Sequence, residues 1–303
     1  MLRQIADYDS NDYDYRTYWD GRDYEQWAEQ RVLHRLVPLL GTPEWLVDFG
    51  GGYGRNARHY RHRARHYVIA DGSANNLRTA AVELAPDIAA GRAFLVRCDL
   101  NALPFREHAF DAALVVRVLH HLSDLDGALA RMAGAVGGRF LLDVPIKHHV
   151  LARVRGAANG PDPVCTGTSE HPFWNFRLSA VRTTLTRAGW HTRPVASVNN
   201  LRRWDRHLSP GLVRTLTPGV RLAELGLQRL GRGWWGPSQF LLAQRVPART
   251  AVSEVPPGVP ALAPRMCCPA CRGRLAWSPA VATCLTCRTP YRWDGAVWQF
   301  TVG

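Results

Sequence analysis

The sequence contains few lysines and few long apolar runs. Outside its last 37 residues it also contains few cysteines. No apolar run reaches the ~18 residues that a membrane-spanning helix needs, which argues against an integral membrane protein. The segment Met1–Asp7 has no signal-peptide core. Only Cys98 and Cys165 precede the cysteine-rich end, which argues against a disulfide framework. We therefore expect a cytoplasmic protein.

The composition allows a folded protein with a sizeable core. The chain has 303 residues, of which 46% are hydrophobic, enough for one large or two modest domains. Its formal net charge of +13 permits attraction to nucleic acid or to anionic surfaces. Arginine greatly outnumbers lysine and alanine is abundant, so a GC-rich genome is an alternative source of this charge.

A glycine-rich segment, Asp48–Gly54, organises the first half of the chain. The apolar run Trp45–Val47 precedes it and a helix start at Arg55–Arg58 follows, which predicts the strand, loop and helix of a parallel crossover. Glycines leave the backbone open to a ligand, and the free N–H groups of the helix favour a negative group. The alternative is a tight turn without a ligand.

The spacing within this segment separates two classes of nucleotide ligand. A dinucleotide fingerprint would have its third glycine at the position of Arg55. The carboxylate of Asp48, at the end of the first strand, would repel a pyrophosphate and attract an ammonium. These residues therefore favour S-adenosylmethionine, whose methionine half carries an amine.

Two further carboxylates follow apolar runs. Asp71 ends the run His66–Asp71, about 20 residues after the loop, where a ribose-binding acid is expected. Asp99 directly follows the run Ala93–Cys98. Because doubly wound sheets hold ligands at the carboxyl ends of their parallel strands, the three acids together strengthen the prediction of a nucleotide-type cofactor.

The loop and the acids resemble the motifs of class I S-adenosylmethionine-dependent methyltransferases. Within that family, residues 103–105, 110–111 and 119–122 look closest to the quinone-methyltransferase-like branch. No Asp/Asn-Pro-Pro-aromatic motif follows the fourth expected strand, which argues against an exocyclic amine or a glutamine amide as the acceptor.

The resemblance implies roles for individual residues in binding S-adenosylmethionine. Asp48 would fix the methionine amine, and Arg117 would contact the methionine carboxylate or use only its backbone. Asp71 would accept hydrogen bonds from the ribose hydroxyls, and Asp99 from the adenine amine. The other cofactor-binding residues implied are Gly50, Gly52, Gly54 and Leu100.

Apolar runs alternate with helical patterns along the chain, which predicts an α/β fold. We expect a doubly wound, Rossmann-like sheet of seven mostly parallel strands. After the first three, the strands are expected at residues 110–116, 139–144, 190–198 and 238–245. The expected helices include one started by a capping box of Asp23 and Gln26, a basic helix at 55–65, one ended by Gly137-Gly138 and one at 178–188. The stretch 201–236 is helix-like, with a turn expected at its end, residues 231–236.

The acceptor side of the site is less specified by the sequence. Residues 145–177 form a long insertion, and in methyltransferases of this architecture such insertions shape the acceptor pocket. Tyr18 and Trp19 either line the site or pack elsewhere. His120 and His121 stand where a general base is expected, and the alternative is a pair of helix-start histidines satisfied by the backbone.

Two C-x-x-C pairs separated by twelve residues occupy the end of the sequence. Two such turns hold four thiolates on one Zn²⁺, which leaves no open position and makes the metal structural. A segment of this size lacks the apolar burial to fold alone, and metal binding supplies the missing free energy. A reduced metal-free tail or a redox pair is the alternative. The expected ligands are Cys268, Cys271, Cys284 and Cys287, with Cys268 preferred to the adjacent Cys267 because of its spacing.

Residues 267–300 resemble the Trm112-like zinc ribbon, although Arg292 stands where that family has proline. Proteins of that family bind and stabilise class I methyltransferases, which implies a module that packs in cis on the catalytic domain. A generic zinc ribbon is the alternative. We expect a methyltransferase domain at 1–246 with an N-terminal arm and helix at 1–40, a linker at 247–264 and the ribbon at 265–303.

The resemblance implies methyl transfer from S-adenosylmethionine to an acceptor that the sequence does not identify. The basic charge and the zinc module favour RNA or a component of translation. The resemblance around the fourth strand and the aromatic insertion favour a small molecule such as a quinone, a lipid or a natural product. A non-catalytic adenosyl-binding scaffold is a third alternative.

Overall fold

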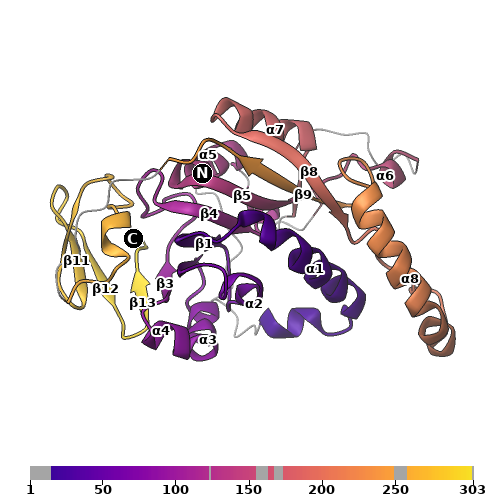
Figure 1. The fold of residues 1–303 in the computed structure, drawn as a ribbon, viewed down its shortest axis with the longest axis horizontal. Helices are drawn as coiled ribbons and strands as arrows, with labels where there is room; N and C mark the ends of the chain where they lie inside the picture. Colours follow the sequence, from indigo (N-terminus) through magenta and orange to yellow (C-terminus); the bar gives the residue numbers. More distant parts are fainter. Residues whose placement is uncertain (1–14, 123, 155–162, 167–172, 249–257, 302–303) are drawn as a thin grey trace.

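The computed structural model describes residues 15–122, 124–154, 163–166, 173–248 and 258–301. Its central feature is a sheet in which seven strands lie in the order β3-β2-β1-β4-β5-β9-β8 (Figure 1). Neighbouring strands pair in parallel from β3 to β5, and β9 is antiparallel to both β5 and β8. The predicted doubly wound, mostly parallel α/β sheet is therefore confirmed.

The strands follow the apolar runs closely. They are β1 (Trp45–Phe49), β2 (His66–Asp71), β3 (Ala93–Arg97), β4 (Phe110–Val115), β5 (Val136–Pro145), β8 (His191–Val198) and β9 (Ser238–Gln244). The helices are α1 (Asp23–Leu36), α2 (Ala57–Tyr60), α3 (Ala74–Glu83), α4 (Ala85–Ala89), α5 (Leu125–Ala135), α6 (Val150–Val154), α7 (Leu178–Arg187) and α8 (Pro210–Leu230). The short elements are η1 (Tyr15–Trp19), η2 (Val37–Leu40), η3 (Leu119–His121), η4 (Ala263–Arg265), β6 (Val164–Cys165) and β7 (Trp174–Asn175).

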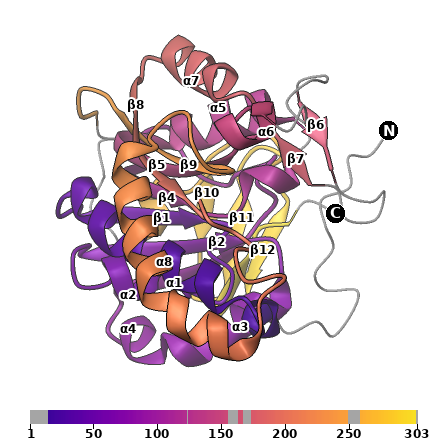
Figure 2. The ribbon, with the colours of Figure 1, turned by 90° about the vertical axis from the view of Figure 1, so that its right-hand side faces the viewer.

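The hydrophobic core lies on both faces of the sheet, because successive side chains of a strand point to opposite faces. In β1, Leu46 belongs to one buried cluster and Val47 to the other. Helices α1 and α3 pack on the first cluster, and α5 and α7 pack on the second (Figure 2). Among the described helices, none combines the length and hydropathy that a membrane span requires.

Two local predictions about helices are wrong, and a third is right in part. Asp23 is the first helical residue of α1, and its N-cap, Arg22, makes no side-chain capping bond, so no capping box forms. The basic stretch 55–65 contains a single helical turn, α2, flanked by turns. The helix-like stretch from residue 201 contains the long helix α8 and ends in the predicted turn at 231–236, but residues 201–207 form turns.

The predicted role of the glycine pair at 137–138 is also wrong. Helix α5 ends at Ala135, and both glycines lie inside β5. A Cβ atom on Gly138 would lie 2.5 Å from the carbonyl oxygen of Asp111 in β4, and one on Gly137 would lie 1.7 Å from that of Ala248. The pair therefore permits close approach of neighbouring backbones rather than ending a helix.

The C-terminal residues add four strands to the same sheet: β10 (Leu275–Trp277), β11 (Val281–Cys284), β12 (Pro290–Trp293) and β13 (Val297–Gln299). They pair with one another as an antiparallel meander, and β13 pairs in parallel with β3. The edge that β3 would otherwise expose is thereby covered. The meander lies at the end of the molecule opposite α8 (Figure 1).

Candidate functional site

A cavity of about 340 Å³ lies at the carboxyl ends of β1, β2, β3 and β4. Residues that follow each of these strands line it, and Thr301 joins them from the C-terminal segment. This is the edge where doubly wound sheets hold their ligands. Of the cofactor-binding residues predicted from the sequence, those lining the cavity are Gly50, Gly52, Asp71, Asp99, Leu100 and Arg117.

The glycine loop forms one wall of the cavity. The N–H of Gly50 donates to the carbonyl of Ala70 at 2.7 Å, and that of Gly52 donates to Oδ2 of Asp71 at 2.8 Å. Both glycines have positive φ angles, +66° and +55°, and a Cβ on Gly50 would lie 2.3 Å from Cγ2 of Val118. Glycine is required here, and it leaves the loop backbone exposed to a ligand.

Asp48 and Gly54 lie outside the cavity lining. Asp48 is 1% exposed and accepts a hydrogen bond of 2.9 Å from the hydroxyl of Tyr60. Its carboxyl group lies beneath Gly51, where a Cβ would be 3.1 Å from the carboxyl carbon. Burial raises the pKa of Asp48 to about 7, although the bond from Tyr60 opposes this shift. Its contact with a methionine amine stays a prediction.

Asp71 and Asp99 are oriented by the backbone around them. Oδ1 of Asp71 accepts from the N–H of Ser73 at 2.9 Å, so this carboxylate bridges the glycine loop and the start of α3. Oδ1 of Asp99 accepts from the N–H of Asn101 at 2.7 Å. Both carboxylates thus line the cavity in fixed orientations, as ribose and adenine recognition would require, and those two roles stay predictions.

Two arginines line the cavity beside the glycine loop, and one buried carboxylate pairs with both. Glu29, which is 2% exposed, forms an ion pair with Arg55 and lies 3.7 Å from Nη1 of Arg117. The guanidinium carbon of Arg55 lies 4.2 Å from the ring centre of Trp19. Arg117 donates to the hydroxyl of Tyr18. Tyr18 and Trp19 therefore pack on the arginines of the wall and do not line the cavity themselves.

Arg55 is a cavity residue that sequence reasoning missed. The sequence places it only in a basic helix at 55–65, yet its side chain is just 7% exposed. Its Nη1 has no hydrogen-bond partner among the described residues. A carboxylate in the cavity would satisfy this buried donor. No local signal could reveal this, because Glu29 lies 26 residues upstream of Arg55.

The two histidines proposed as general bases have different surroundings. His121 lines the cavity, whereas His120 does not. His120 is 7% exposed and stacks on Phe173, with ring centres 4.3 Å apart. Burial lowers the pKa of His120 well below its ordinary value, which keeps the ring neutral. Of the two, His121 is the one placed to meet a bound acceptor, and a catalytic role for either stays a prediction.

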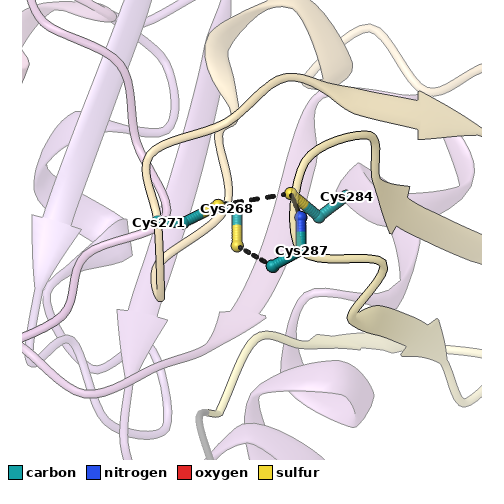
Figure 3. Close-up of side chains that lie close together, drawn as sticks. All are labelled: Cys268, Cys271, Cys284 and Cys287. Atoms are coloured by element: carbon teal, nitrogen blue, oxygen red, sulfur yellow. Dashed lines mark hydrogen bonds between the residues drawn. The ribbon is translucent and has the colours of Figure 1, made fainter.

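The four predicted metal ligands form one cluster. Figure 3 shows the side chains of Cys268, Cys271, Cys284 and Cys287 on two facing turns, with their sulfur atoms directed toward one another, and all four sulfurs lie within 4.8 Å of each other. The Cys268–Cys287 and Cys271–Cys284 sulfur pairs are 3.6 and 3.4 Å apart. Zn–S bonds of about 2.3 Å place tetrahedral sulfurs about 3.8 Å apart, so this donor set fits a structural zinc ion.

Cys267 does not belong to this cluster. It is 3% exposed, and burial raises the pKa of its thiol to about 11. Tyr291 supports the cluster from outside, with its hydroxyl 3.0 Å from the sulfur of Cys268. A partner of this kind orients a metal-bound thiolate.

Residues 47–142 match the model of a methyltransferase domain family. No curated protein sequence matches the chain. The chain is similar in structure to the [4+2]-cyclase SpnF, at 21% identity and a TM-score of 0.51, over 76% of this chain and 86% of that one. It is also similar to an S-adenosylmethionine-dependent methyltransferase from Listeria monocytogenes, described as putative, at 13% identity and a TM-score of 0.53, over 74% of this chain and 99% of that one.

A third similar structure is a complex between the Haloferax volcanii Trm112 methyltransferase activator and a methyltransferase described as putative. The identity is 15% and the TM-score 0.52, over 78% of this chain and 95% of that one. At these identities the three structures establish the fold alone, whereas the family match adds the activity. The chain therefore contains a class I methyltransferase domain and is an S-adenosylmethionine-dependent methyltransferase.

Proposed function

We propose that this enzyme transfers the methyl group to a small, largely apolar acceptor. The observation that supports this is that aromatic side chains pack behind the cavity residues Arg117 and His121. The guanidinium carbon of Arg117 lies 4.9 Å from the ring centre of Tyr18 and 5.2 Å from that of Trp19. Phe173, from the insertion at 145–177, stacks on His120 directly before the cavity residue His121.

The cavity residues hold the cofactor and orient the acceptor. S-adenosylmethionine supplies a methyl group that its sulfonium already activates, so the protein chiefly aligns the two reactants. The backbone of Gly50 and Gly52 leaves room for the methionine half, and Asp71 and Asp99 accept hydrogen bonds from the nucleoside. His121 takes the acceptor's proton where the acceptor must lose one.

RNA or a component of translation is the second candidate acceptor. The formal net charge of +13 favours it, because phosphate backbones bind arginine-rich surfaces. The two acceptor classes differ in their response to salt: binding of RNA weakens steeply as salt rises, and binding of an apolar small molecule does not.

Methyl transfer from labelled cofactor into separated lipid-soluble, RNA and protein fractions tests this proposal. We expect label in the lipid-soluble or small-molecule fraction, and much less of it when Asp71→Asn replaces the wild-type enzyme at a cofactor concentration that does not saturate the variant. Label in the RNA or protein fraction alone would reject the small acceptor and favour the second candidate. The variant controls for methylation by contaminating enzymes.

The four-cysteine module is proposed to hold one structural zinc ion and to stabilise the catalytic domain in cis. The parallel pairing of β13 with β3 supports this role, and so do bonds from the module to the turn after β3. The side chain of Arg106 donates to the carbonyl of Met266 at 3.0 Å, and the N–H of Arg106 donates to the carbonyl of Arg265 at 2.9 Å. A Trm112-like origin of the module, and the quinone-methyltransferase-like branch of the domain, belong to the same proposal.

A further inference from the structure

The four-cysteine module contacts the segment that carries Asp99 and Leu100. After β13, the N–H of Phe300 donates to the carbonyl of Arg97 at 2.8 Å, and this extends the pairing with β3 to its last residue. The next residue, Thr301, lines the cavity together with Arg97, Asp99 and Leu100. The module therefore supplies part of the cavity wall at the end assigned to adenine.

Arg272 makes a second connection between the module and this segment. Its guanidinium group donates to the carbonyl of Leu103 at 2.7 Å and to that of Phe105 at 2.6 Å. Between these two, the carbonyl of Pro104 accepts from the N–H of Cys267 at 2.8 Å. Three consecutive carbonyls of the turn after Leu100 are thus held by the module.

The conformation of the metal-binding turn sets the direction of the Arg272 side chain. Arg272 directly follows Cys271, has a φ of +62°, and donates its N–H to the carbonyl of Cys268 at 2.8 Å. A non-glycine residue in this left-handed region is strained and persists only when its surroundings impose it. A metal bound to Cys268 and Cys271 would impose it by fixing both ends of the turn.

The second metal-binding turn offers a comparison within the same chain. Arg288 directly follows Cys287, also has a φ of +62°, and donates its N–H to the carbonyl of Cys284 at 3.0 Å. Its side chain is exposed and makes no side-chain hydrogen bond or ion pair within the described parts of the chain. Arg272 and Arg288 therefore share a backbone environment. They differ in that Arg272 contacts the turn after Leu100, whereas Arg288 does not.

We propose that Arg272 and Thr301 position the adenine end of the cofactor site, so that metal binding by the cysteines and binding of S-adenosylmethionine stabilise each other. The inference rests on the proposed cofactor site and on the proposed zinc ion. Both ligands order the same turn, and a ligand that binds an already ordered segment loses less conformational entropy. The coupling must be reciprocal, because it is an equilibrium property.

Two measurements on the full-length protein test the coupling. The first is calorimetric titration of wild type, Arg272→Met and the matched control Arg288→Met with S-adenosylhomocysteine and with adenosine. We expect Arg272→Met to bind both ligands about 5- to 20-fold more weakly than wild type, within the usual range of such couplings. Arg288→Met should bind both like wild type.

The second measurement is the affinity of each protein for zinc, determined by competition with a coloured chelator at equilibrium. Saturating S-adenosylhomocysteine should tighten zinc binding by wild type and by Arg288→Met by about fivefold or more, and should have little effect on Arg272→Met. This readout separates positioning from general destabilisation, because a merely destabilised protein would still respond to the ligand.

Equal affinities of wild type and Arg272→Met would overturn the inference, as would an equal loss in Arg288→Met. A zinc affinity of wild type that does not respond to the ligand would also overturn it. Failure of the proposed function looks different: wild-type protein would then bind no S-adenosylhomocysteine, or would contain no zinc.

Discussion

The hydroxyl of Tyr60 donates a hydrogen bond of 2.9 Å to Oδ2 of Asp48, and both side chains are buried beneath the glycine loop. Burial raises the pKa of Asp48 to about 7, and the bond from Tyr60 is the largest of the effects that oppose it. The carboxyl group of Asp48, near the end of β1, is therefore half-charged near neutral pH. Two predictions concern this pair.

The first prediction is that the contribution of Asp48 to the free energy of unfolding decreases as pH rises from about 4 to about 7. Across this range the unfolded chain has already released the proton of Asp48, while the folded protein retains it, so stability is lost as pH rises through the folded-state pKa. Asp48→Asn should remove this slope. The free energy of unfolding of the variant, measured relative to that of wild type, should be about 2–4 kcal/mol higher at high pH than at low pH. Urea unfolding at several pH values measures it, and parallel curves for the two proteins would refute it.

The second prediction concerns the methionine amine. The carboxylate of Asp48, lying beneath the glycine loop, should attract the positively charged amine of S-adenosylmethionine. The affinity for S-adenosylmethionine should therefore rise as pH rises through about 7, where the carboxyl group of Asp48 becomes charged. Asp48→Asn should bind more weakly and without this rise. Calorimetry on both sides of that pH measures the effect. The same pH profile in wild type and variant would remove Asp48 from cofactor binding.

The third prediction concerns Asp71, whose carboxylate holds both the glycine loop and the start of α3. Asp71→Asn should weaken binding of S-adenosylhomocysteine by about 10- to 100-fold, since it removes charge-assisted hydrogen bonds to the ribose and to the N–H of Gly52. Glu83→Gln, an exposed carboxylate at the end of α3, is the control and should bind normally. An unchanged affinity in Asp71→Asn would exclude its assigned role.

The fourth prediction assigns a ligand group to Arg55. Arg55→Met should weaken binding of S-adenosylhomocysteine by about tenfold or more, because a buried guanidinium pairs strongly with a carboxylate. It should leave binding of methylthioadenosine, which lacks the carboxylate, nearly unchanged. Arg58→Met, three residues further and exposed, is the control. Equal losses for both ligands would show that Arg55 supports the loop without contacting the methionine half.

The fifth prediction is that purified protein contains about one zinc ion per chain, as four clustered thiolates require. Cys271→Ser should lose most of this zinc and lower the melting temperature. Cys267→Ser, the neighbouring cysteine outside the cluster, should retain the zinc. Elemental analysis and thermal unfolding measure both effects. A zinc content near zero in wild-type protein prepared with reductant and without chelator would contradict the assignment.

Local patterns in the sequence were sufficient for the seven strands from β1 to β9 in the main sheet and for most of the cavity. The segments ending at Phe49 and Asp71 are continuous apolar runs, because strands buried on both faces carry apolar side chains on each face. The two cysteine pairs were recognised by their spacing. The helix starts and ends were less predictable: Asp23 matches a capping signal but is the first residue of α1, and the glycine pair at 137–138 lies inside β5, where neighbouring backbones approach closely.

The sequence by itself determined the seven strands from β1 to β9 in the main sheet, the glycine loop, the position of Asp71 and Asp99 at strand ends, and the two cysteine pairs, because each depends on residues close together in the chain. Only the tertiary structure decided that Glu29 pairs with Arg55 and Arg117, that β13 continues the sheet beside β3, and that Arg272 holds the turn after Leu100. These contacts join residues far apart in sequence, and their free energy depends on burial and distance that no local pattern records.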